Sequence, residues 1–216
     1  MKKSLILSLI MFSGIIICWG FKDEIISRSK NISGNKKEKK SNARELIISI
    51  QPFSDISQDK VNYVVNELKK VYSKVEVKQP IPLPGYCKNY DKSRYRADSL
   101  IRYLKNRTKE GYLTIGLTTR DISATKGKDA DFGIMGLGYR PGNSCIASLF
   151  RLKGENRLEK LYKVAIHELG HTNGLPHCPV KTCLMRDAEG KDHLNEEKEF
   201  CPSCKATLVK AGWALK

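Results

Sequence analysis

The chain has few histidines, few aromatic residues and a shortage of acidic side chains relative to basic ones. Only 4 of its 216 residues are histidine, and Phe, Trp and Tyr together make up 8%. It contains no internal repeat, and its length and 40% hydrophobic content suffice for one globular domain with a core of its own. Lys and Arg outnumber Asp and Glu by 39 to 23. This positive charge is spread along the chain and does not interleave with aromatic residues, so we expect no nucleic-acid partner.

An apolar run long enough to span a membrane is also missing at the N-terminus. The run at 5–19 falls short of the about 20 residues that a spanning helix needs. Because two lysines precede it, residues 1–20 are predicted to be an export signal. An uncleaved membrane anchor, which would give membrane association, and lipidation at Cys18 are the alternatives. Residues 21–42, which include KKEKK, predict a basic flexible linker. We therefore expect the protein outside the cytoplasm.

Hydrophobic periodicity divides residues 43–216, the predicted folded domain, into strands and helices. Alternation around β-branched residues predicts the first strand, a mostly apolar run at 112–118 predicts a central strand, and apolar residues at helical spacing predict amphipathic helices. The expected strands are ELIISIQPF, 74–78 and 112–118; two glycine-rich strands follow at 132–139 and 144–152; the expected helices are 59–72, 97–108 and 155–173.

Three of the four histidines lie within the stretch HELGHTNGLPH. His167 and His171 are four residues apart, so on a helix both rings leave the same face and can share one zinc ion. Glu168 lies about 100° further around the axis, which turns its carboxylate to the side of the ion. Gly174 can end the helix in a left-handed conformation, after which His177 can supply a third nitrogen. Three protein ligands with a fourth position open are typical of a catalytic zinc site.

This stretch resembles the signature of the metzincin metallopeptidases, HExxHxxGxxH. The cysteine directly after His177, the C-x-M of 183–185 and the later CPSC resemble the archaemetzincins in particular, and the similarity covers about 44–208. The resemblance implies an α/β (α+β) metzincin-like fold: a mixed twisted sheet with an antiparallel edge strand, packed helices, an active-site helix and a small zinc-stapled C-terminal lobe. It also implies that Met185 forms a hydrophobic floor beneath the metal.

The same resemblance assigns a role to the glycine-rich segment 132–138. In metzincins an antiparallel edge strand above the zinc pairs with the extended substrate, and this segment is the candidate. Its glycines would let another backbone come close. The alternative is a bulged strand whose glycines only relieve packing.

Two pairs of cysteines have the spacing of a closed structural zinc site within 178–204. Cys178 and Cys183 form the first pair, and Cys201 and Cys204 the second. Because an exported chain can oxidise its thiols, two disulfides are the competing interpretation.

For three further residues the sequence suggests an environment but no role in the chemistry. Cys87 and Cys145 either pair with each other or are separate buried thiols. His193 lies in a highly charged segment, so we expect its side chain to be solvated.

These patterns predict a zinc-dependent peptidase. The three histidines would hold a catalytic zinc, and Glu168 would act as general base on water. A second, structural zinc would be held by the four cysteines. The expected partner is a peptide or protein substrate, the expected oligomeric state is a monomer, and the resemblance suggests aminopeptidase-like action. The alternative is a catalytically silent zinc-binding or interaction protein that retains the metzincin fold.

Overall fold

The computed structural model describes residues 46–188 and 191–216. The predicted export signal at 1–20 and the predicted linker at 21–42 lie outside the described residues, so both stay predictions. In the part of the chain that is described, no helix is both long and apolar enough to cross a membrane.

A five-stranded mixed sheet forms the centre of the fold. Its strands run in the order β2 (Val75–Val77), β1 (Ile47–Pro52), β4 (Tyr112–Thr118), β8 (Ser144–Ser148) and β7 (Gly136–Gly138). The first four are parallel, and β7 alone pairs antiparallel, with β8. The mixed sheet with an antiparallel edge strand, which the family resemblance implied, is therefore confirmed.

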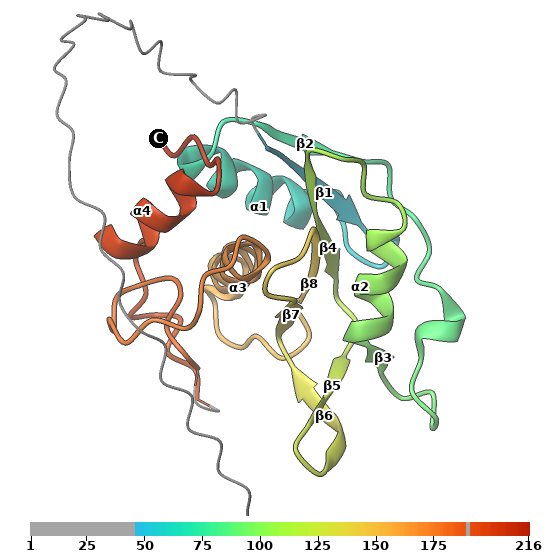
Figure 1. Cartoon of the computed structure of the whole chain (residues 1–216). Helices are drawn as coiled ribbons and strands as arrows, with labels where there is room; N and C mark the ends of the chain where they lie inside the picture. Colours follow the sequence, from blue (N-terminus) through green and yellow to red (C-terminus); the bar gives the residue numbers. More distant parts are fainter. Residues whose placement is uncertain (1–45, 189–190) are drawn as a thin grey trace, which may run out of the picture. The chain divides into compact units, whose positions relative to one another are not determined.

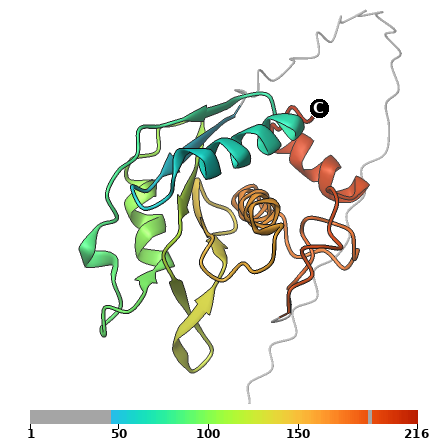
Figure 2. The same cartoon turned by 180° about the vertical axis from the view of Figure 1, so that it is seen from behind.

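Three helices cover the two faces of this sheet. Figures 1 and 2 show α1 (Gln58–Val71) and α3 (Arg157–Thr172) on one side and α2 (Ala97–Lys105) on the other. The alternation of β8 explains the two faces: Cys145 and Ala147 belong to the core with α1 and α3, whereas Ile146 belongs to the core with α2. Both cores are built from the amphipathic faces that the periodicity predicted.

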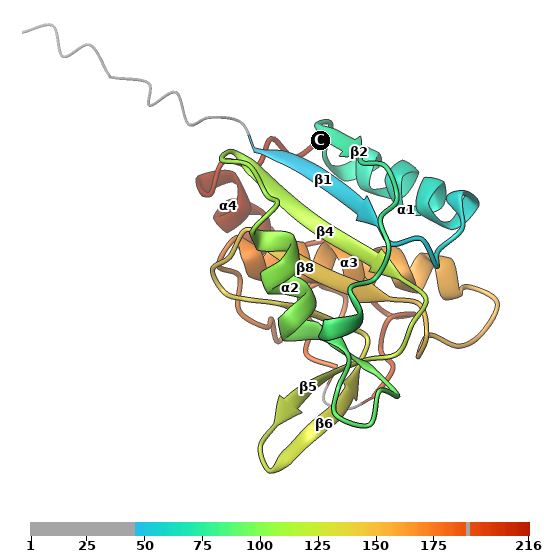
Figure 3. The same ribbon diagram turned by 90° about the vertical axis from the view of Figure 1, so that its right-hand side faces the viewer.

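The glycine-rich segment expected as one strand at 132–139 is divided between two sheets. Residues before Met135 belong to β6 (Asp129–Ile134), which forms an antiparallel hairpin with β5 (Ile122–Lys126). β5 also pairs with the two-residue β3 (Tyr95–Arg96). The carbonyl of Met135 accepts the amide of Ser148 at 2.8 Å, which brings the chain into the main sheet as β7. The expected second strand at 144–152 ends early, at Ser148. Figure 3 shows the β5–β6 hairpin projecting beyond the main sheet.

The C-terminal segment returns to the main core. Helix α4 (Pro202–Lys210) begins with proline at its first position and is followed by Trp213, which is 2% exposed. The ring of Trp213 lies 5.2 Å from that of Tyr72 and 6.3 Å from that of Phe200, between centroids. A short 3₁₀ helix, η1 (Gly85–Cys87), precedes β3. Neither α4 nor β5 was predicted from the sequence.

Candidate active site

Helix α3 places the motif residues between the core and solvent. Its apolar arc, including Leu161, Ala165 and Leu169, is buried against the sheet and α1. His167 and His171 lie on the other side and are half-buried. The helix ends at Thr172, and Gly174 has φ +89°, the left-handed conformation that the sequence predicted for it.

The structure brings the three motif histidines together. Their ring centroids are 4.6 Å apart for His167 and His171, 5.4 Å for His167 and His177, and 4.9 Å for His171 and His177. One ligand nitrogen from each ring lies within 4.8 Å of those of the other two. Three nitrogens at this separation can converge on a single ion.

Each ring already has a partner for its Nδ1 atom. Nδ1 of His167 lies 2.7 Å from the carbonyl oxygen of Leu184, and Nδ1 of His171 lies 2.8 Å from that of Leu175. Nδ1 of His177 is 3.1 Å from the carboxylate of Asp187. Such partners fix the tautomer and leave Nε2 for a metal. The three residues therefore fit a divalent metal ion of the zinc type.

Burial keeps the imidazoles of His167 and His171 neutral. Loss of solvent, with the neighbouring His171 adding to it, lowers the pKa of His167 to about 4. Burial also lowers the pKa of His171. A neutral imidazole has the free lone pair that a metal needs, so no proton competes for the site at neutral pH.

Glu168 is enclosed between α3 and β7. It is 8% exposed, and burial raises its pKa to about 8, against the opposing effect of a hydrogen bond from the backbone of Gly138. A Cβ atom on Gly138 would lie 2.6 Å from the carbonyl oxygen of Glu168, and one on Gly136 would lie 2.7 Å from its Oε1. The sequence suggested that the glycines in this segment let another backbone come close. In the structure, the backbone that approaches the glycines of β7 is that of helix α3.

Met185 lies beneath the motif helix. It is fully buried, and its sulfur contacts α3 at Gly170, where a Cβ atom would come within 2.4 Å. The residue before it, Leu184, supplies the carbonyl that holds His167. The resemblance implied a methionine at this place.

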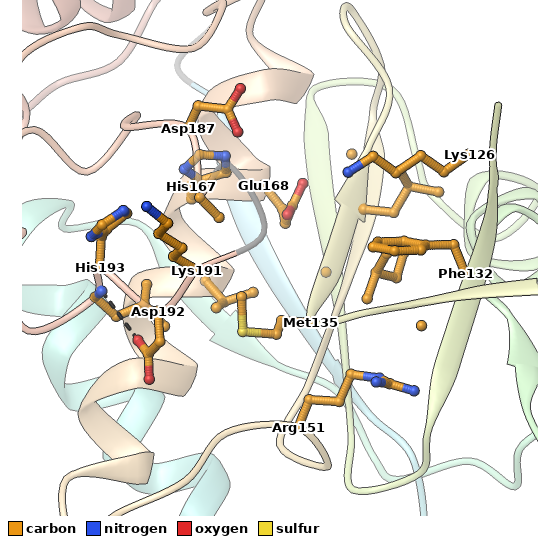
Figure 4. Close-up of a pocket in the computed structure, with 18 of the residues that line it drawn as sticks. Lys126, Phe132, Met135, Arg151, His167, Glu168, Asp187, Lys191, Asp192 and His193 are labelled. Atoms are coloured by element: carbon orange, nitrogen blue, oxygen red, sulfur yellow. Dashed lines mark hydrogen bonds between the residues drawn. The ribbon is translucent and has the colours of Figure 1, made fainter. Parts of the chain in front are cut away.

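A cleft of about 780 Å³ opens in front of the histidines. Figure 4 shows His167, Lys191 and His193 along one side and Lys126, Phe132 and Arg151 along the other. Among the described residues, β7 is the last strand of its sheet and also lines the cleft, so one of its edges is unpaired there. The cleft is open to an extended chain along that edge.

Several residues of the cleft wall were not found from the sequence. Lys126, Arg151 and Glu197 line the cleft, and no local motif marks them. The expectation that His193 is solvated is wrong: its side chain is 18% exposed, it contacts Glu196 at 3.2 Å, and it lines the cleft. The charged segment that contains it folds back against the active site.

The four C-terminal cysteines form a second cluster. Sγ of Cys178 lies 3.7 Å from that of Cys201, and Sγ of Cys183 lies 3.7 Å from that of Cys204. A disulfide needs about 2.05 Å, whereas a tetrahedron with Zn–S bonds of about 2.3 Å has edges of about 3.8 Å. All four sulfurs lie within 4.8 Å of one another. The spacing therefore fits a closed tetrahedral metal site.

The cysteine cluster is joined to the histidine site by the backbone. The amide of Cys178 donates to the carbonyl of Met185 at 2.7 Å. Burial raises the pKa of Cys201, but hydrogen bonds with Cys204 and the other cysteines outweigh this effect and lower that pKa to about 7.

The two remaining described cysteines lie apart from this cluster. Cys87 and Cys145 are both buried, are not paired with each other and belong to different cores. The interpretation of Cys87 and Cys145 as separate buried thiols is therefore confirmed.

Comparison with known proteins identifies the family. The sequence pattern of peptidase family M54 matches residues 41–210. The chain belongs to peptidase family M54. An archaemetzincin from Archaeoglobus fulgidus is 31% identical over 166 residues, covering 74% of this chain and 98% of that protein. One from Haloarcula marismortui is 26% identical over 176 residues, covering 75% of this chain and 99% of the other.

Solved structures agree with this assignment. The archaemetzincin of Methanopyrus kandleri has the same fold, with a TM-score of 0.67 at 24% identity over 79% of this chain and 97% of that one. The archaemetzincin of Archaeoglobus fulgidus, complexed with malonate, gives 0.64 at 28% identity over 75% and 99% of the two chains. The expected resemblance to archaemetzincins is confirmed, and with it membership of a family of zinc metallopeptidases.

Proposed function

We propose that this M54 protein hydrolyses peptide bonds with Glu168 as general base and zinc held by His167, His171 and His177. The observation that carries the proposal is the convergence of three imidazoles beside a buried carboxylate, at the unpaired edge of β7. The chemistry that a zinc ion supplies in such a place is Lewis acidity, which polarises a carbonyl and acidifies water.

The chain's own residues supply the other parts of the reaction. The unpaired edge of β7 aligns an extended peptide by backbone hydrogen bonds, so that its scissile bond lies in front of the histidines. Glu168 takes a proton from the attacking water and later passes it to the leaving nitrogen. A divalent charge held by the three histidines would lower the pKa of Glu168 from about 8 towards the ionised, basic form.

We further propose that Cys178, Cys183, Cys201 and Cys204 hold a second, structural zinc. The 3.7 Å sulfur separations support it, as does the direct hydrogen bond between Cys178 and Met185. Closed Cys₄ sites have no free position for substrate and contribute directly to folding. This site would fix the loop that carries His177.

Incubation of the zinc-loaded full chain with a mixed peptide library tests the function. New termini should appear by mass spectrometry, disappear when a chelator removes the metal, and return when zinc is restored. The library should contain free and acetylated N-termini, because aminopeptidase-like action would consume only the free ones. A zinc-loaded chain that cleaves nothing would instead support the catalytically silent alternative.

A further inference from the structure

We propose that Arg151, on the cleft wall that also carries Lys126, binds a carboxylate of the peptide substrate. This inference rests on the proposed function, because it names the substrate class of the same cleft. The carboxylate is either an acidic side chain or the free C-terminus of the peptide, and both present the same group to the site.

Arg151 is held rigidly by Asp121. Its Nε and Nη2 atoms each donate to a different carboxylate oxygen at 2.8 Å, and the Asp121 side chain is only 11% exposed. This two-point contact fixes the plane of the guanidinium. Its Nη1 atom has no hydrogen-bond partner within residues 46–188 and 191–216 and remains able to donate. A guanidinium with a fixed plane and a spare donor is well suited to bind a carboxylate.

The strand beside Arg151 is shaped to receive this side chain. A Cβ atom on Gly133 of β6 would lie 1.9 Å from Nη2 and 2.0 Å from the central carbon of the guanidinium. The group therefore lies flat against the glycine backbone, at a place where any larger residue would displace it. Asp121 fixes the guanidinium in this place, so it cannot move aside for a side chain at position 133. The observed position of Arg151 therefore requires glycine at 133.

Lys126 adds a second positive charge to the same wall of the cleft, on the other side of Phe132 from Arg151 (Figure 4). Its ammonium lies 4.6 Å from the centroid of the Phe132 ring and, in the described ranges, forms no ion pair. Asp129 is its partner in strand register across the hairpin, yet the two side chains form no salt bridge there. Lys126 is thus a cation without a counterion at the cleft wall.

Three of the acidic residues that line the cleft are engaged by other side chains. Asp131 pairs with Arg94 at 2.9 Å, Asp187 pairs with His177, and Asp192 pairs with Lys160 at 2.6 Å. These contacts leave the free positive charge of Lys126 and the spare donor of Arg151 available for an incoming anion. In Figure 4 both lie across the cleft from His167, with Met135 between the two sides. A peptide aligned with β7 can therefore place one of its carboxylates here while its backbone passes the histidines.

Peptide retention by the zinc-loaded full chain carrying Glu168→Gln tests this without requiring turnover. The probe is a synthetic library in matched sets: Asp and Glu against Asn and Gln, and free C-termini against amides. We expect retention of the carboxylate members by about tenfold over their amide partners. This ratio should fall to about one in Arg151→Gln and by about threefold in Lys126→Gln. Which matched set shows the preference identifies the source of the carboxylate.

Lys153→Gln is the matched control, because it removes the same charge from an exposed lysine outside the cleft. If Arg151→Gln does not fold, Lys126→Gln decides, since that side chain has no ion pair to lose. A retention ratio near one in the parent chain, or one unchanged by both substitutions, overturns the proposal. Cleavage of the same libraries by the wild type separates the carboxylate-site hypothesis from the peptidase hypothesis. Cleavage without acid preference refutes only the carboxylate site, whereas retention without cleavage refutes only the peptidase activity.

Discussion

The sulfur of Met185 occupies the space that a side chain at Gly170 would need. A Cβ atom at that position would lie 2.4 Å from Sδ and 3.2 Å from the terminal methyl carbon of the methionine. Gly170 lies within the HELGH motif, one residue before His171. The glycine lets the buried methionine approach the helix that carries two of the candidate metal ligands, and Leu184, next to Met185, holds the ring of His167.

Gly170→Ala is expected to destabilise the protein, although alanine favours helix by about 1 kcal/mol over glycine. Overpacking of a filled core costs about 1–3 kcal/mol, and here the obstructing atoms are fully buried. We expect a net loss of up to about 2 kcal/mol in urea unfolding, together with weaker zinc retention. Gly85→Ala is the control, because a Cβ atom added at that glycine would meet no other atom within 4 Å. Equal stability of the two variants would contradict the packing described for Met185.

Glu197 should make stability depend on pH. It is 4% exposed, its Oε2 atom has no hydrogen-bond partner in the described structure, and burial raises its pKa from 4.5 to about 7. Between these two values the folded chain binds more protons than the unfolded chain, so this residue lowers stability as pH rises from about 4.5 to about 7. Glu197→Gln removes that loss. The variant should match the wild type near pH 4.5 and exceed it at pH 8 by about 2 kcal/mol.

Urea unfolding of both proteins at pH 5 and pH 8 measures this difference. Glu155→Gln serves as control, since it makes the same substitution at an exposed position. A difference between Glu197→Gln and the wild type that is the same at both pH values would show that the buried carboxyl is not the cause.

Cys201→Ser should remove the structural metal and loosen the C-terminal lobe. A closed zinc site contributes its binding free energy to folding, so we expect a loss of at least about 3 kcal/mol and of one zinc per chain. Ser203→Ala, an exposed position between the two cysteines of the same pair, is the control. Native mass spectrometry gives the zinc count, and thermal unfolding gives the stability. A chelator-treated wild type that unfolds at its original temperature would rule out the structural site.

The sequence predicted those parts of the site that depend on local spacing. His167 and His171 share a helical face because they are four residues apart, and Gly174 takes the left-handed conformation that a turn towards His177 requires. The strand at 112–118 was found because it is a mostly apolar run, and the main helices were found because their buried residues repeat with a helical period. These features are short-range consequences of backbone geometry.

The remaining parts depend on contacts between distant segments, which no local pattern records. Arg151 and Gly133 are adjacent only because β6 and the segment after β8 pass each other. β5 was missed because its second half is polar and exposed, so it lacks the alternation of a half-buried strand. Likewise, α4 has no strongly amphipathic pattern, and it is positioned by Leu208 and the packing of Trp213 against Tyr72. The glycines of β7 suggested a close approach, but only the structure identified α3 as the neighbour.

Comparison of peptide cleavage by wild type and Glu168→Gln, at equal measured zinc content, tests the central claim most directly. Glutamine keeps the size of the side chain but cannot accept the proton of the attacking water. Loss of a general base costs about 10²–10⁴-fold in rate, so cleavage by the variant should fall at least a hundredfold while both zinc ions stay bound. Cleavage by the zinc-loaded variant at the wild-type rate would contradict the assignment of Glu168 as the base.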